Sequence, residues 1–150
     1  MFEKLASYVL KRKTLVRWST RIHIFVYRLT RGWMGGLVSG VPNLLLTTTG
    51  RKSGLKRTTP LFYLPDKKNF VVVASYGGSP NDPLWWKNLQ ADPKGWVEVG
   101  DKTFEVEAHQ ASEELKAQLW PVFVRHYSSY QLYQERTERR IPLVVLTPTE

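Results

Sequence analysis

The sequence predicts a mainly β protein in which about six short antiparallel strands form a small barrel or half-barrel with helices on its outside. Short apolar and β-branched runs recur between turn residues, and the short connections favour antiparallel pairing. Helical periodicity appears only in separate segments before and between these runs. The 150 residues are 42% hydrophobic, which suits one domain with a substantial core.

The first predicted element is a basic amphipathic helix over residues 14–31. Its apolar side is formed by residues at spacings of three and four: Leu15, Trp18, Ile22, Phe25 and Leu29. Residues 1–40 hold eight Lys and Arg against one Glu, so they supply +7 of the formal net charge of +9. Two interpretations stay open. The helix packs on the domain with a solvated basic rim, or residues 11–31 rest on an anionic membrane surface.

The strands begin after this helix and a glycine-rich segment. They are predicted at Leu44–Thr49, Thr58–Leu64, Phe70–Ser75, Trp96–Val99, Thr103–Ala108 and Ile141–Leu146. The Gly100-Asp101 pair supplies the turn of a hairpin between the fourth and fifth strands.

Three further helices are predicted between the strands. Asn81 and Asp82 followed by Pro83 indicate a polar cap and a helix start, and that helix stops before Asp92-Pro93. Ser112 is predicted to cap a helix that runs to about His126. A shorter helical stretch follows, to about residue 136.

Composition excludes several kinds of chemistry. The chain has no cysteine, which removes disulfides, thiolate nucleophiles and cysteine-bound metals, and which is compatible with a cytoplasmic location. No histidine pair or carboxylate cluster has the spacing of a metal site, so none is predicted. Glycines and Pro42 interrupt the uncharged residues 32–50, which argues against a membrane span there. Redox chemistry would therefore need a bound organic cofactor.

The strongest local feature is the glycine-bounded basic loop Gly50–Gly54, followed by the segment Lys56–Pro60. Two glycines allow a tight turn with exposed N–H groups, and four cations and three hydroxyl residues lie within or beside it. Such a loop suits a phosphate or carboxylate, although it has neither P-loop nor Rossmann spacing. An ordinary solvated hairpin turn is the alternative interpretation.

Two weaker features complete the candidate site. Ala74–Gly78 follows the valine-rich strand, and its glycines would let a flat ring approach the backbone. Tyr127, Tyr130 and Tyr133 are spaced so that they share one face of a helix. Taken separately, these patterns are better explained by an ordinary loop and an ordinary amphipathic helix.

Taken together, these motifs resemble the F420-dependent nitroreductase and F420H2-dependent quinone reductase family. The resemblance covers about residues 25–148. It rests on motifs in the family's order and spacing: Leu44–Gly54, Arg57–Leu61, Ala74–Gly78, Pro83–Pro93, Tyr127–Arg136 and Arg140–Pro142. It implies a split β-barrel of the flavin-reductase type over residues 32–150, preceded by the basic amphipathic segment 1–31. It also implies coenzyme F420 as the cofactor, with FMN less favoured.

The resemblance assigns expected roles to individual residues. Cofactor binding is expected from Arg51, Lys52, Ser53, Gly54, Arg57, Thr58, Thr59, Pro60, Leu61, Val73, Ala74, Ser75, Tyr76, Gly77, Trp85, Asn88 and Leu89. Lys52 and Arg57 are expected to hold the phosphate and acidic tail. Catalysis is expected from Ser75, Tyr127, Tyr130 and Tyr133, with the second and third of these tyrosines lining the substrate pocket.

The implied function is transfer of a hydride from reduced F420 to a quinone, menaquinone-like, or nitro-aromatic acceptor. A basic N-terminal helix on the inner face of the membrane would give access to a lipid-soluble quinone. An FMN-binding or haem-related split barrel and a non-catalytic F420 carrier are the alternatives. A nucleic-acid-binding module is disfavoured, because the excess charge lies on one helix and no recognised nucleic-acid motif is present.

Overall fold

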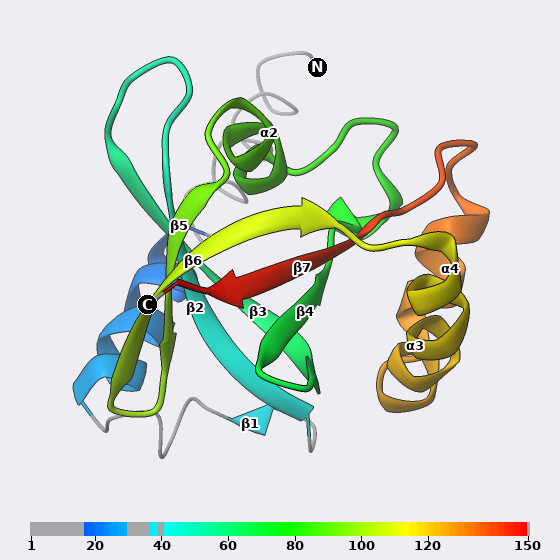
Figure 1. Ribbon diagram of the computed structural model, residues 1–150, viewed down its shortest axis with the longest axis horizontal. Coiled ribbons are helices and arrows are strands. Elements are labelled where there is room, and N and C mark those ends of the chain that lie inside the picture. Colours follow the sequence, from blue (N-terminus) through cyan, green and yellow to red (C-terminus); the bar gives the residue numbers. More distant parts are fainter. Residues whose placement is uncertain (1–16, 30–36, 39–40, 150) are drawn as a thin grey trace, which may run out of the picture.

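The computed structural model of the chain describes residues 17–29, 37–38 and 41–149, and these form a closed barrel of antiparallel strands (Figure 1). The strands are β1 Leu37–Val38, β2 Val41–Thr49, β3 Lys56–Asp66, β4 Asn69–Val73, β5 Lys94–Val99, β6 Lys102–Gln110 and β7 Leu143–Pro148. Their order is β1-β2-β3-β4-β7-β6-β5, and β5 pairs back onto β2. Six strands therefore close the barrel, as predicted, while the two-residue β1 adds only to the edge of β2.

Closure depends on β2, which pairs with a neighbour along both of its edges. Leu45 lies opposite Pro60 of β3 on one side and opposite Glu98 of β5 on the other. Leu44, Leu45 and Leu46 are all fully buried, which explains why this strand is a continuous apolar run rather than an alternating one.

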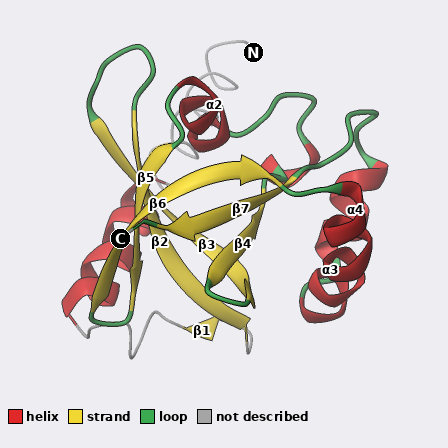
Figure 2. Ribbon diagram, viewed as in Figure 1, coloured by secondary structure: helices red, strands yellow, loops and turns green. Residues whose placement is uncertain are grey.

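The helices lie around the barrel in separate places (Figures 1 and 2). They are the N-terminal helix at residues 17–29, the 3₁₀ turn η1 at Tyr76–Gly78, α2 at Leu84–Ala91, α3 at Glu113–His126 and α4 at Ser129–Glu135. Helices α3 and α4 lie together on one side, the N-terminal helix lies on the opposite side, and α2 lies near the β2–β3 loop. The β2–β3 loop and η1 both remain outside the barrel wall.

The core has two parts, separated by the sheet formed by β4 and β7. Inside the barrel, Val72 and Val144 pack with side chains from β2, β5 and β6 and with the tryptophans of α2. Outside it, Val71 and Val145 pack against Phe123 of α3 and Tyr130 of α4. Because successive side chains of a strand point to opposite faces, the neighbouring valines of β4, and likewise those of β7, pack in different parts of the core.

Several predicted boundaries are shifted, for identifiable reasons. β4 ends at Val73 because Ser75 takes helical dihedral angles at the start of η1. β7 starts at Leu143, two residues later than predicted, and runs on to Pro148. The predicted polar cap of α2 is wrong: the cap position is Pro83, and no side chain accepts a capping bond there. Ser112, in contrast, caps α3 as predicted, since its Oγ accepts from the N–H of Leu115 at 3.1 Å.

The N-terminal helix docks on the barrel through a different side from the predicted apolar stripe. Tyr27 is buried, and its hydroxyl accepts from the N–H of Gly100 at 2.9 Å and donates to the carbonyl of Glu98 at 3.2 Å. Arg28 also forms two bonds to the Glu98 carboxylate, of 3.0 and 2.9 Å. Packing of the stripe on the domain is therefore wrong for its described part, because Trp18, Ile22, Phe25 and Leu29 are 59–71% exposed.

Two predictions concerning this segment lie outside the described residues. They are the start of the helix at residue 14 and the division of the chain between residues 31 and 32, both of which stay predictions.

Candidate cofactor-binding site

The β2–β3 loop is held in a tight, exposed turn. The N–H of Gly54 donates to the carbonyl of Gly50 at 2.8 Å, and the N–H of Gly50 donates to the carbonyl of Leu55 at 2.8 Å. Gly54 has a φ of 70°, a left-handed conformation that glycine adopts without steric cost. The two glycines therefore allow the loop to be closed by its own backbone hydrogen bonds, while the side chains between them are exposed to solvent.

This loop forms one wall of a cleft of about 450 Å³, and α2 forms the other. Eight of the residues expected to bind a cofactor line it: Arg51, Lys52, Ser53, Arg57, Thr58, Thr59, Trp85 and Asn88. Four further residues join them from the described part of the chain: Arg17, Thr48, Gly50 and Leu84. The lining thus has four cationic side chains and no carboxylate. Such a set of donors fits a phosphate or a chain of carboxylates.

Asn88 joins the two walls of the cleft. Its Oδ1 accepts from the N–H of Arg51 at 3.1 Å, and its Nδ2 donates to Oγ1 of Thr48 at 3.1 Å. Asn88 and Thr48 are 6% and 1% exposed, so the bond between them lies away from water. One buried amide therefore fixes the position of the basic loop relative to α2.

Replacing Asn88 by alanine is expected to lower the free energy of unfolding by about 1–3 kcal/mol, because the buried Thr48 hydroxyl loses its partner. The variant should also bind an anionic ligand more weakly, since the loop is no longer tied to α2. Urea denaturation measures the first effect. Asn81→Ala, at an exposed position before α2, is the matched control. Equal stability of the two variants would show that Asn88 has no such role.

The other residues expected to bind a cofactor are not among those that line this cleft, and their environments differ. Val73, Ala74 and Leu89 are buried in the core, so any contact with a ligand would come from their backbone. Gly54 lies in the basic loop, and Pro60 and Leu61 continue along the half-buried β3. Ser75 is half-buried, whereas Tyr76 and Gly77 are exposed.

The turn that contains Ser75 is pressed against α4. Tyr76, Gly77 and Gly78 have φ values of 45°, 62° and 78°, so the chain reverses sharply after β4. A Cβ placed on Gly78 would lie 2.5 Å from the carbonyl oxygen of Tyr133. Only glycine allows this approach, which brings the turn beside one of the predicted tyrosines.

The three tyrosines come together, although not on one helix. Tyr127 is the C-cap residue of α3, while Tyr130 and Tyr133 belong to α4, so the predicted single helical face is wrong. The ring centroids are 5.2–6.3 Å apart, and the hydroxyls of Tyr127 and Tyr133 are 3.2 Å apart. Tyr130 is 7% exposed and packs edge-on against Phe123.

A match to a family model decides the affiliation of the chain. The model of the F420H(2)-dependent quinone reductase family matches residues 18–148. The chain belongs to this family. An F420H(2)-dependent quinone reductase of Mycobacterium tuberculosis is 43% identical over 131 residues, which are 85% of this chain and 88% of that protein.

Solved structures support the same affiliation and the predicted split barrel. The structure of an F420-H2 dependent reductase matches with a TM-score of 0.63 and 38% identity. The match covers 70% of this chain and 93% of the reductase chain. A haem-storage protein of Vibrio cholerae has a TM-score of 0.55 at 15% identity over 72% of this chain and 82% of its own, which shows the shared fold alone.

The pKa values of this reductase's tyrosines differ according to their surroundings. The hydrogen bond from Tyr133 is the main cause of a lowered pKa at Tyr127. The same bond raises the pKa of Tyr133, and burial raises that of Tyr130. Tyr127 is therefore the first of the three to ionise, and Tyr133 keeps its proton to higher pH.

Sequence patterns missed several residues of this reductase's site. Arg17 was assigned to the solvated rim of its helix, and only the docking of that helix brings it to the cleft. Thr48 and Leu84 were predicted only as parts of a strand and a helix, and the cleft brings both beside the basic loop. Arg139, which donates to the carbonyls of Ala74 and Ser75, gave no signal at all, because it stands in the charged run Glu138–Arg140.

Proposed function

We propose that this chain binds reduced coenzyme F420 in the cleft between the β2–β3 loop and α2 and uses it to reduce a quinone of the menaquinone type. Membership of the family makes the chain an F420H2-dependent oxidoreductase. The observation that supports the location is the set of four cations in one cleft without a carboxylate. F420 is a deazaflavin with a phosphate and an acidic tail, and in its reduced form it supplies a hydride from C5 of its central ring.

The basic side of the cleft would hold the charged part of the cofactor. Lys52 and Arg57 would bind the phosphate and the tail carboxylates, and Arg17 would add a further charge from the N-terminal helix. The exposed N–H groups of the loop would complete this set. Trp85, 7% exposed and part of the barrel core, would give the cleft a rigid apolar wall.

The residues beside η1 would act on the acceptor. A quinone oxygen gains negative charge when it receives a hydride, so a hydrogen-bond donor at that oxygen stabilises the transition state. Ser75 offers a hydroxyl next to the turn, and Tyr133 offers a phenol whose raised pKa keeps its proton in place. Binding both partners in fixed positions supplies the rest of the acceleration.

A titration that compares F420 with FMN tests the cofactor. We expect F420 to quench or shift the protein's tryptophan fluorescence at much lower concentration than FMN, because only F420 has an acidic tail to pair with the cleft. Preference for FMN would contradict the proposal and favour the FMN-binding alternative.

The exposed face of the N-terminal helix supports docking of the protein on an anionic membrane. Trp18, Ile22, Phe25 and Leu29 form a solvent-facing apolar stripe. Arg21 and Arg28 lie beside Phe25 and Leu29, and Arg28 also pairs with Glu98. A helix with large apolar residues on one side and cations beside them suits the interface of an anionic bilayer. No described helix is long and apolar enough to cross a membrane.

Vesicle binding tests this docking. The protein should sediment with vesicles that contain anionic lipid at low salt, and binding should weaken as salt screens the arginines. Replacing Trp18 and Phe25 by alanine should weaken binding at least about tenfold, since each loses apolar area worth roughly 1.5–3 kcal/mol when fully buried. Leu132→Ala, at an exposed site on α4, is the control. Failure of the intact protein to bind anionic vesicles at low salt would refute the docking.

A further inference from the structure

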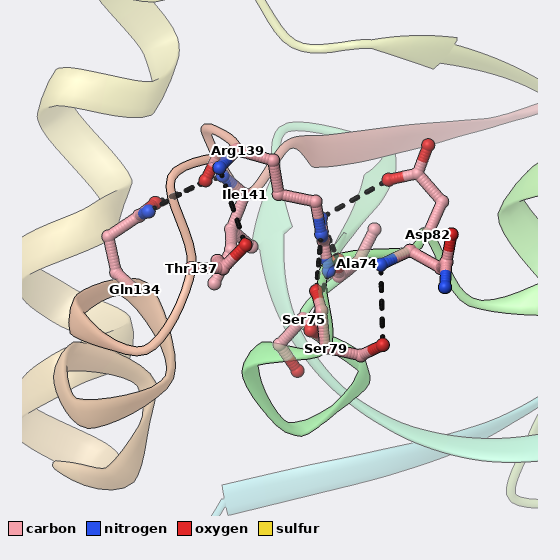
Figure 3. A network of polar contacts seen from close by, with 9 residues as sticks. Ala74, Ser75, Ser79, Asp82, Gln134, Thr137, Arg139 and Ile141 are labelled. Atoms are coloured by element: carbon pink, nitrogen blue, oxygen red, sulfur yellow. Dashed lines mark hydrogen bonds and ion pairs between the residues drawn. The ribbon is translucent and has the colours of Figure 1, made fainter.

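Arg139 is a largely buried cation whose side-chain donors form hydrogen bonds mainly with the backbone of one turn. The residue belongs to the segment between α4 and β7, and its side chain is 16% exposed and points to the turn that contains Ser75 (Figure 3). Nε donates to the carbonyl of Ser79 at 2.8 Å, and Nη2 donates to the carbonyl of Ser75 at 2.7 Å. Both Nη atoms reach the carbonyl of Ala74 at 3.2 Å, and Nη1 also pairs with the Asp82 carboxylate at 3.2 Å. A buried guanidinium persists only when its donors are satisfied in this way.

These bonds fix the orientation of two peptide groups beside the proposed acceptor site. In a trans peptide, the carbonyl of one residue and the N–H of the next point in opposite directions. Because the carbonyls of Ala74 and Ser75 point at Arg139, the N–H groups of Ser75 and Tyr76 point away from it. Neither N–H has an acceptor within the described part of the chain.

The backbone of Arg139 is in turn fixed to α4. The side-chain amide of Gln134 donates to the carbonyl of Arg139 at 2.8 Å and accepts from the N–H of Ile141 at 2.9 Å. Gln134 directly follows Tyr133, whose backbone carbonyl contacts the turn at Gly78. Arg139 therefore connects the helix that presents Tyr133 to the turn that presents Ser75.

We propose that Arg139 is a positioning residue for hydride transfer, which sets the Ser75 turn relative to Tyr133 through the carbonyls of Ala74, Ser75 and Ser79. This inference rests on the proposed function, because it assigns the aligned turn to the reacting end of the site. The phosphate-binding end depends on the β2–β3 loop and Asn88, which Arg139 does not contact. Loss of Arg139 should therefore slow the chemical step while leaving cofactor affinity nearly intact.

Lysine is the informative replacement at this position. It keeps the positive charge, but an ammonium group cannot reach four separate acceptors in one plane as a guanidinium does. A displacement of about 1 Å at a reacting centre can cost about 100-fold in rate. We expect Arg139→Lys to slow hydride transfer about 10- to 100-fold and to change the Kd for F420 less than about threefold.

The test is anaerobic single-turnover reoxidation of the F420H2-loaded protein by menadione, together with an F420 titration and circular dichroism of each variant. Arg140→Gln is the matched control, because Arg140 is the neighbouring arginine, is 72% exposed and forms its ion pair with Glu113, away from the Ser75 turn. Equal rates for Arg139→Lys and Arg140→Gln would overturn the proposal. So would a loss of F420 affinity as large as the loss of rate, because the role would then be general folding.

A second variant keeps the proposal testable if Arg139→Lys does not fold. Gln134→Ala leaves the guanidinium in the chain and removes only the side-chain bonds that hold residues 139 and 141. Its rate should fall more than that of Arg140→Gln, and an unchanged rate would overturn the proposal. A wild-type protein that does not reoxidise with menadione refutes the proposed function itself, whereas an active wild type with active variants refutes only the role of Arg139.

Discussion

Replacing Lys52 and Arg57 together by glutamine is expected to raise the Kd for F420 about 100-fold. Both side chains line the cleft, and both are exposed when no ligand is bound. A hydrogen bond to a charged group contributes about 1.5–3 kcal/mol, and exposure places these two near the lower end. About 1.4 kcal/mol from each residue corresponds to a tenfold change per residue.

Salt and a control at a cation outside the cleft separate direct contacts from the overall charge of the protein. Lys68→Gln removes one cation from the exposed β3–β4 turn, and it should leave the Kd within about twofold of the wild type at moderate salt. The double variant should also show a weaker salt dependence of binding than the wild type. A double variant that binds F420 as tightly as Lys68→Gln would place the acidic tail somewhere other than this cleft.

Ser75→Ala and Tyr133→Phe are two separate tests of the donor to the acceptor oxygen. The variant that lacks this donor is expected to have a kcat/KM for a quinone that is lower by about 100-fold or more. Removal of one preorganised donor to a developing oxyanion typically costs about 10²–10³ in rate. F420 affinity should change little, because neither side chain lines the basic cleft. If kcat/KM were unchanged in both variants, neither residue would be the donor.

The tyrosine pair adds a pH signature to the same experiment. In the wild type, Tyr127 has a lowered pKa mainly because Tyr133 donates to its phenolate. Tyr133→Phe removes that donor, so the pKa of Tyr127 should rise towards the ordinary value for tyrosine. Titration of tyrosinate absorbance should therefore show the first ionisation moving to higher pH in Tyr133→Phe. An unmoved first ionisation would mean that the two hydroxyls do not interact in solution.

Local sequence patterns were sufficient to predict the barrel and the basic loop. The alternation of apolar and polar residues and β-branched runs such as Val71–Val73 are patterns among residues adjacent in the sequence. The strands could therefore be placed before any tertiary contact was known. The Gly50–Gly54 loop is likewise closed by its own hydrogen bonds. Its cations could be recognised as a group because they are adjacent in the sequence.

Contacts between distant parts of the chain account for what could not be predicted. Arg139 reaches Asp82 across 57 residues, so neither side chain shows its role locally, and Asp82 resembled a helix cap instead. The apolar stripe of the N-terminal helix resembled a packed face, yet docking occurs through Tyr27. β4 ends before Ser75, because the backbone of Ser75 has helical φ and ψ angles, whereas β propensity alone extended the predicted strand to Ser75.

Anaerobic mixing of the F420H2-loaded protein with menadione in a stopped-flow instrument tests the proposed hydride transfer most directly. We expect oxidised F420 to appear in a fast single phase, and we expect the rate to fall in the Ser75 or Tyr133 variant while cofactor affinity is retained. A nitro-aromatic acceptor in the same assay shows whether reduction extends beyond quinones. Tight binding of F420H2 without reoxidation by any quinone would refute the proposed reductase function and point to a carrier of the cofactor.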